Sequence, residues 1–135
     1  MGEAQLDLLE RLLARIEDYA TTVTRLELET DLDTWLKVTR ALELAAQCCI
    51  DLAMEMVARR GLGLPESNRD AFIRLAHAGL LTSEQADALG GWAGLRNVLA
   101  HLYGSIDLDR LHSALREDKT VLRELGRIAA RELAD

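Results

Sequence analysis

A single proline, Pro65, interrupts the 135 residues of this chain. Proline is the residue that helix interiors tolerate least, so its rarity leaves long stretches free to form helices. Apolar residues recur at steps of three and four, the spacing of one helix face, and we find no stretch with the period-two alternation of a half-buried strand. These features predict an all-α fold, an up-and-down bundle of four to five helices in a single domain over residues 1–135.

The apolar stripes predict five helices, over residues 3–29, 32–59, 68–78, 83–102 and 108–132. Residues typical of helix N-caps precede four of them: Asp31, Ser67, Thr82 and Asp107. Asp70 and Gln85 stand where the partner residue of a capping box belongs. The helix over 83–102 contains Gly90, Gly91 and Gly94, which indicates a kink or the close approach of another backbone.

The helix predicted over residues 32–59 is the most apolar of the five. Two adjacent apolar stripes indicate that it packs on more than one side, either at the centre of a bundle or against a partner chain. Its remaining face carries a row of polar residues at steps of four: Glu43, Gln47, Asp51 and Glu55. This row is either a solvated face or a set of groups that holds a basic side chain from a neighbouring helix.

Composition and charge narrow the functional classes. The net charge of −7 disfavours a protein that coats nucleic acid non-specifically, although it allows a local positive cleft. No apolar run reaches the roughly 18 residues that a membrane helix needs, and the first residues lack the layout of a secretion signal. We therefore expect a cytosolic protein with no membrane partner. Cys48 and Cys49 are adjacent and point about 100° apart on a helix, which predicts buried thiols and not a disulfide.

The stretch over residues 95–104 carries the side chains best suited to chemistry: Arg96, Asn97, His101 and Tyr103. A histidine takes or gives a proton near neutral pH, and the fork of donors on an arginine matches phosphate oxygens. RNA cleavage without a metal needs a base for the ribose 2′-OH and positive charge on the pentacoordinate phosphorus. No Cys or His cluster has the spacing of a metal site, so we expect neither a metal nor another cofactor.

The helix geometry sets a condition on this chemistry. Five residues turn a helix by about 140°, so a straight helix does not aim Arg96 and His101 at one point. The two side chains converge in a cleft that wraps around the helix, or where the last turn unwinds near Gly104. A two-fold axis beside the helix brings two copies of each together. Taken singly, Arg96 is also explained as a surface charge and His101 as a structural histidine.

The spacing Arg96-x4-His101-x-Tyr103 matches the motif of HEPN domains. The surrounding residues 94–107 resemble the HepT toxins within that superfamily, and so do residues 41–53 and 75–81. The resemblance covers nearly the whole chain. It implies a HEPN-like homodimer with the motif at the dimer cleft, acting as a metal-independent ribonuclease on RNA and not DNA.

The resemblance also implies roles and partners. Arg96 and His101 are expected to be catalytic, Asn97 and Tyr103 to orient the RNA, and the products to end in 2′,3′-cyclic phosphates. The implied partner is a minimal nucleotidyltransferase antitoxin of the MntA type, which silences the toxin by AMPylation of the motif tyrosine, here Tyr103. AMP adds negative charge and bulk where an RNA phosphate must sit. Leu102 departs from the acidic residue that many relatives carry there.

Charge and fold leave two further points open. Because the chain is acidic, we expect Arg59, Arg60 or Arg69 to add positive potential near Arg96. The alternatives to a ribonuclease are a non-catalytic HEPN module that binds a nucleotide or RNA end or dimerises, and a helical adaptor whose broad apolar second helix only makes an oligomer.

Overall fold

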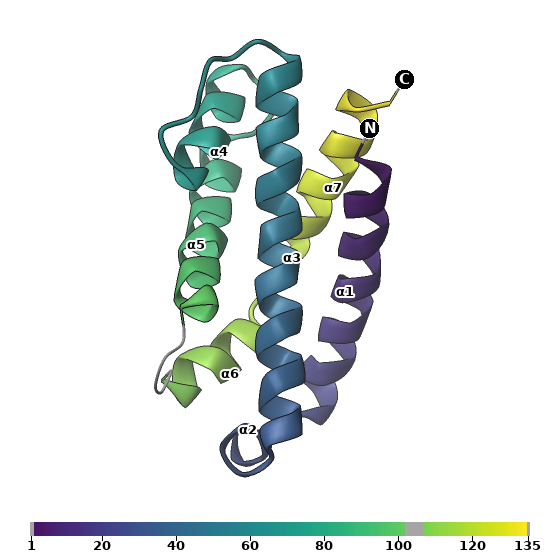
Figure 1. The fold of residues 1–135 in the computed structure, drawn as a ribbon, viewed down its shortest axis with the longest axis vertical. Helices are drawn as coiled ribbons and strands as arrows, with labels where there is room; N and C mark the ends of the chain where they lie inside the picture. The colour runs from purple at the N-terminus through teal and green to yellow at the C-terminus, as the bar shows by residue number, and fades with distance from the viewer. Residues whose placement is uncertain (1, 102–106, 135) are drawn as a thin grey trace.

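The computed structural model describes residues 2–101 and 107–134, and every regular element within them is an α-helix. Figure 1 shows α3 running the length of the molecule, with α4 and α5 along one side and α1 and α7 along the other. This confirms the expected all-α bundle. The described helices are, in chain order, α1 (Glu3–Thr22), α2 (Arg25–Thr30), α3 (Leu32–Arg59), α4 (Asn68–His77), α5 (Ser83–Ala100), α6 (Leu108–Arg116) and α7 (Thr120–Glu132).

Helix α3 is the centre of the bundle and contacts every other described helix. Its bounds are those that the sequence predicts, and Leu42, Leu52 and Met56 on it are fully buried. Ile16 of α1 and Phe72 of α4 pack into the same core. The broad apolar arc of α3 is therefore covered largely within one chain.

The expectation of one helix over residues 3–29 is wrong, because the chain breaks between α1 and α2. Val23 has extended backbone, and Thr24 starts a new helix with a capping box. The Thr24 side chain accepts from the Glu27 N–H, and the Glu27 carboxylate accepts from the Thr24 N–H, each at 3.1 Å. This local bonding competes with continuation of the helix. Val23 stays buried, so the apolar stripe continues across the break.

The expectation of one helix over residues 108–132 is also wrong. Helix α6 ends at Arg116, and Asp118 accepts from the backbone N–H and hydroxyl of Thr120 at the start of α7. Lys119, which is buried, donates from Nζ to the carbonyls of Leu115 at 2.7 Å and Glu117 at 2.6 Å. These bonds satisfy carbonyls that the end of α6 leaves without partners. Burial lowers the pKa of Lys119.

The predicted caps of α4, α5 and α6 are confirmed. Thr82 and Gln85 form a complete capping box at α5, and Asp107 accepts from the first turn of α6. Ser67 caps α4, but the second bond differs from a capping box, because the Asp70 carboxylate accepts from the N–H of Glu66 at 2.9 Å. Helix α5 ends at Ala100, where the sequence pattern runs on to residue 102, which lies outside the described residues.

The glycines of α5 lie in unlike surroundings. A Cβ on Gly90 would come within 2.5 Å of Nη1 of Arg69, so a side chain and not a backbone approaches there. The same atom of Arg69 lies 4.0 Å from Asp87. A Cβ on Gly91 or Gly94 would meet no atom within 4 Å. These two glycines therefore form an open surface on α5.

Cys48 and Cys49 are free and buried, as predicted. Burial raises the pKa of Cys48 to about 11 and that of Cys49 further. Both side chains therefore stay protonated and act as apolar core groups. In the described part of the chain, no helix combines the length and the apolarity that crossing a membrane requires.

Candidate active site

The motif residues within the described structure lie at the C-terminal end of α5. Arg96 and Asn97 belong to the last helical turns, and His101 follows Ala100 as the C-cap residue. The backbone of His101 leaves the helix with φ −116° and ψ 35°, while its N–H still donates to the Val98 carbonyl at 3.3 Å. The helix thus ends immediately before His101, the histidine of the motif.

Arg96 is half-buried. Its Nη1 donates to Oδ1 of Asn97 at 3.1 Å, and its Nε is buried without a hydrogen-bond partner. Within residues 2–101 and 107–134, Arg96 forms no ion pair. A guanidinium that no carboxylate neutralises keeps its charge for an anion, and a phosphate fits its fork of donors.

His101 is exposed, and one ring nitrogen is held by the backbone. Nδ1 lies 2.8 Å from the carbonyl oxygen of Asn97. A carbonyl only accepts, so Nδ1 carries the proton in this bond. The neutral ring then has its lone pair on Nε2, which is the nitrogen able to remove a proton from a substrate.

Asn97 connects the two predicted catalytic residues. Its side-chain oxygen accepts from Arg96 and its main-chain oxygen accepts from His101. On a helix Asn97 lies about 100° from Arg96 and about 40° from position 101, between the two. The structure therefore brings Arg96 and His101 to one end of α5 through Asn97, although they lie on different sides of the helix. Tyr103 and Leu102 lie outside the described residues.

The expectation that Arg59 and Arg60 add positive charge beside Arg96 is wrong. Both lie at the C-terminal end of α3, which Figure 1 shows at the top of the molecule, whereas α5 ends below the middle. Arg60 forms an ion pair with Glu132 at 2.8 Å, and Arg59 donates to the carbonyl of Leu133 at 3.1 Å. These arginines fasten α3 to the end of α7.

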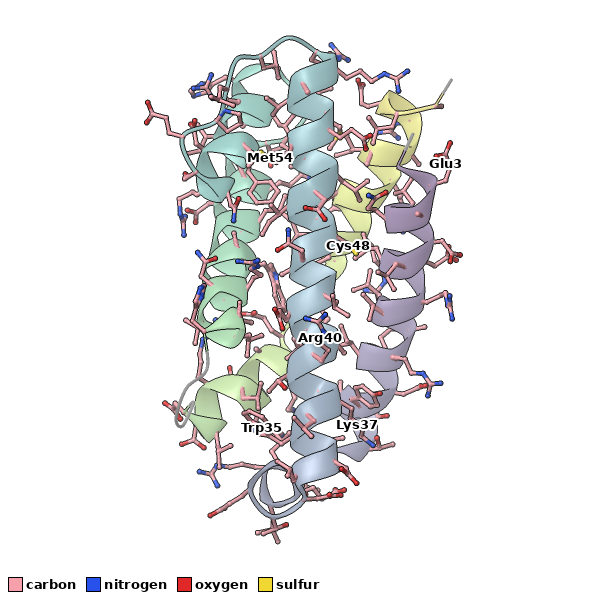
Figure 2. All side chains as sticks on the ribbon, viewed as in Figure 1. Glu3, Trp35, Lys37, Arg40, Cys48 and Met54 are labelled. Atoms are coloured by element: carbon pink, nitrogen blue, oxygen red, sulfur yellow. The ribbon has the colours of Figure 1, made fainter. Side chains whose placement is uncertain are left out.

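Another arginine lies closer than these two to the height of the motif along the bundle. Figure 2 shows Arg40 on the front of α3, at the height where α5 ends. Its side chain is exposed, and its Nη1 lies 3.2 Å from Oε1 of Glu43. Sequence reasoning did not single out Arg40, because only the packing of α3 against α5 sets the two helices at this relative height. The one available signal is its place three residues before Glu43, the first member of the polar row.

The polar row of α3 bonds along its own helix. Glu43 accepts from Arg40, and Gln47 donates to Asp51 at 2.8 Å. Oε1 of Gln47 is buried without a partner. Elsewhere, His77 is exposed and His112 is half-buried. No group of three His, Cys, Asp or Glu side chains among the described residues is arranged to hold a metal ion.

Comparison with known proteins places this helical frame in a family. A model of the family described as Ribonuclease HepT-like matches residues 9–127, which is most of the chain. The chain belongs to the HepT-like family. Its motif residues within that span include Arg96, Asn97 and His101, and also Tyr103.

Two curated relatives of this HepT-like chain are named as nucleases. It is 38% identical to an mRNA nuclease HepT of Shewanella oneidensis over 68 residues, which are 50% of this chain and 51% of that protein. The match thus spans about half the length of that relative. It is 28% identical to a tRNA nuclease HepT of Aphanizomenon flos-aquae over 113 residues, covering 84% of this chain and 76% of the relative.

Solved structures share the fold of this HepT-like chain. One is a tri-AMPylated Shewanella oneidensis HEPN toxin in complex with an MNT antitoxin, with a TM-score of 0.82, 24% identity and 94% of each chain covered. Another is YutE of Bacillus subtilis, a cytosolic protein of unknown function, with a TM-score of 0.71, 19% identity and coverage of 93% and 87%. At these identities the likeness shows the fold alone.

Proposed function

We propose that this protein is a cytosolic, metal-independent endoribonuclease and the toxin of a toxin–antitoxin pair. The observation that carries the proposal is the arrangement at the end of α5, where Asn97 joins an ion-pair-free guanidinium, Arg96, to an exposed imidazole, His101. The family and the names of its nuclease relatives support RNA as the substrate. DNA lacks the 2′-OH that this chemistry needs.

The proposed reaction begins with proton transfer. Nε2 of His101 takes the proton of a ribose 2′-OH, and the 2′-oxygen forms a bond to the adjacent phosphorus. The guanidinium of Arg96 stabilises the negative charge of the pentacoordinate phosphorus. The bond from phosphorus to the 5′-oxygen then breaks, and that oxygen takes a proton from a second imidazole. The products end in a 2′,3′-cyclic phosphate and a 5′-hydroxyl.

The second imidazole is the reason to propose a homodimer. Each chain supplies one motif histidine, and one imidazole does not serve as base and acid in the same step. A two-fold axis beside α5 gives the cleft two copies of Arg96 and His101. The open surface at Gly91 and Gly94 lies on the same helix and allows a close approach of a second chain.

The bonds of Asn97 favour a role different from the one expected from sequence. Its Oδ1 accepts from Arg96, so we assign it to orienting the catalytic side chains. Orientation of the RNA is left to Tyr103, which offers a hydroxyl and a ring that stacks on bases. A minimal nucleotidyltransferase of the MntA type is the proposed antitoxin, and Tyr103 is the proposed site of AMPylation. The AMPylated toxin of similar fold supports this assignment.

Cleavage assays on purified protein test the function. We expect RNA fragments with 2′,3′-cyclic phosphate ends in the presence of EDTA, and none from His101→Ala or Arg96→Ala. His77→Ala is the matched control, because His77 is an exposed histidine on α4. Equal cleavage by folded His101→Ala would contradict the mechanism. RNA or nucleotide binding without any product from the wild type would instead identify a non-catalytic HEPN module.

A further inference from the structure

Two buried polar atoms have no hydrogen-bond partner within the described part of the chain: Oε1 of Gln47 on α3 and Nε of Arg96 on α5. The oxygen of Gln47 is an acceptor and the Nε–H of Arg96 is a donor, so the two groups are complementary. Buried polar groups are nearly always paired in folded proteins, because no water replaces the lost bond. Helices α3 and α5 pack directly against each other, so the two groups belong to neighbouring helices.

The register of the two helices places Gln47 near the height of Arg96. Figure 2 shows Arg40 on α3 at the height where α5 ends, and α5 ends at Ala100. The helices are antiparallel, so Arg96 lies level with a point about four residues after Arg40 on α3. Gln47 is roughly three residues, or about 5 Å of axial rise, beyond that point. Two long side chains span this offset.

The orientation of α3 turns Gln47 toward α5. Figure 2 shows Met54 on the side of α3 that faces α4 and α5, whereas Cys48 lies on the side toward α1. Gln47 is seven residues before Met54, about two helical turns, and therefore shares its face. Gln47 is also half-buried although it belongs to a polar row, as expected for a side chain at a helix contact.

Asp51 fixes which end of the Gln47 amide points toward Arg96. Nε2 of Gln47 donates to Oδ1 of Asp51 at 2.8 Å. An ionised carboxylate only accepts, so the NH2 end of the amide must face Asp51 and Oε1 must face away from it. Asp51 lies one turn toward the C-terminus of α3. Oε1 is therefore directed toward the preceding turn, which is the height of Arg96.

We propose that Gln47 is a positioning residue for Arg96: a small rotation of the two side chains lets Oε1 of Gln47 accept the Nε–H of the guanidinium, a bond that neither atom makes in the structure. Asn97 already holds Nη1 of the same group. With two of its edges held, the guanidinium presents its remaining donors in a fixed direction. Gln47 is neutral, so it orients the guanidinium without neutralising it. A glutamate at this position would form an ion pair with Arg96 and compete with a phosphate.

The bond itself is tested by NMR of the arginine side chains, without RNA. The ¹⁵N–¹H resonance of the Arg96 Nε is identified as the one that disappears in Arg96→Lys. We expect slow exchange of this proton with water in the wild type, and exchange faster by about tenfold or more in Gln47→Met, which keeps the side-chain length. Gln5→Met on α1 is the matched control. Fast exchange in the wild type, or no change in Gln47→Met, overturns the proposal.

The role in phosphate binding rests on the proposed function and is tested in His101→Ala, which binds RNA without cutting it. We expect Gln47→Met to weaken RNA binding roughly three- to tenfold, and Gln47→Glu to weaken it more and to flatten its salt dependence. In an Arg96→Lys background Gln47→Met should have no further effect. A full effect there would show that Gln47 does not act through Arg96. If the wild type neither binds nor cuts RNA, the proposed function fails, and the exchange measurement still decides the bond.

Discussion

Both oxygen atoms of Asn97 accept hydrogen bonds from side chains at the end of α5. The side-chain oxygen accepts from the guanidinium of Arg96, and the main-chain oxygen accepts from the His101 ring. The main-chain bond needs no particular side chain at position 97, whereas the bond to Arg96 does. A substitution at position 97 therefore removes only one of the two hydrogen bonds. It releases the guanidinium of Arg96 and leaves the bond that fixes the tautomer of His101.

This separation gives a prediction for Asn97→Ala. We expect RNA cleavage to fall about tenfold, because losing one hydrogen bond that orients a charged group costs about 1.5 kcal/mol in the transition state. The pH profile of the residual activity should stay that of the wild type, since His101 keeps its bond to the carbonyl. Asn68→Ala on α4 is the control. A shifted pH profile would contradict the assignment of Nδ1 to the Asn97 carbonyl.

At the scale of elements, the corner between α6 and α7 depends on one buried lysine. Nζ of Lys119 donates to two carbonyls at the end of α6 and lies 5.7 Å from the ring centroid of Trp92 on α5. Lys119 thus joins three helices at one point.

We expect Lys119→Met to destabilise the fold by about 1–3 kcal/mol, since the variant keeps the apolar stem but leaves buried carbonyls without a donor. The midpoint of urea unfolding, measured by circular dichroism, checks this. Lys37→Met is the control, because Lys37 is an exposed lysine whose Nζ also lies near an aromatic ring, at 5.3 Å from the centroid of Tyr19. An equal loss of stability in both variants would show that the carbonyl bonds contribute nothing.

At the scale of the whole molecule, the proposal requires two chains in one cleft. Co-expression of Arg96→Ala chains with His101→Ala chains tests it. Each homodimer lacks one function entirely, whereas a mixed dimer keeps one guanidinium and one imidazole on different chains. The mixed dimer lacks the second imidazole, so water must protonate the leaving 5′-oxygen, and we expect only a small part of the cleavage activity to return, measured on RNA with the dimers separated by affinity tags. No recovery in purified mixed dimers would refute a shared cleft.

Sequence reasoning missed two helix breaks because the buried stripe runs across both of them in the whole molecule. The breaks at Val23 and at residues 117–119 leave the apolar stripe in phase, because Val23 and Leu122 are both buried. Periodicity therefore continues across each break and does not reveal it. The breaks come from side chains that bond the backbone locally, such as Thr24 at α2. The free energy of a broken helix with these bonds differs little from that of a continuous helix without them.

Sequence alone determined the helical class, the bounds of the central helix and the motif at the end of α5, because each of these depends on residues that are neighbours along the chain. The tertiary structure decided which of the other arginines lie far from that motif, and it packed α3, which carries Gln47, against α5, which carries Arg96. About fifty residues separate these two positions. Only the antiparallel packing of two helices sets their register, and no local pattern records it.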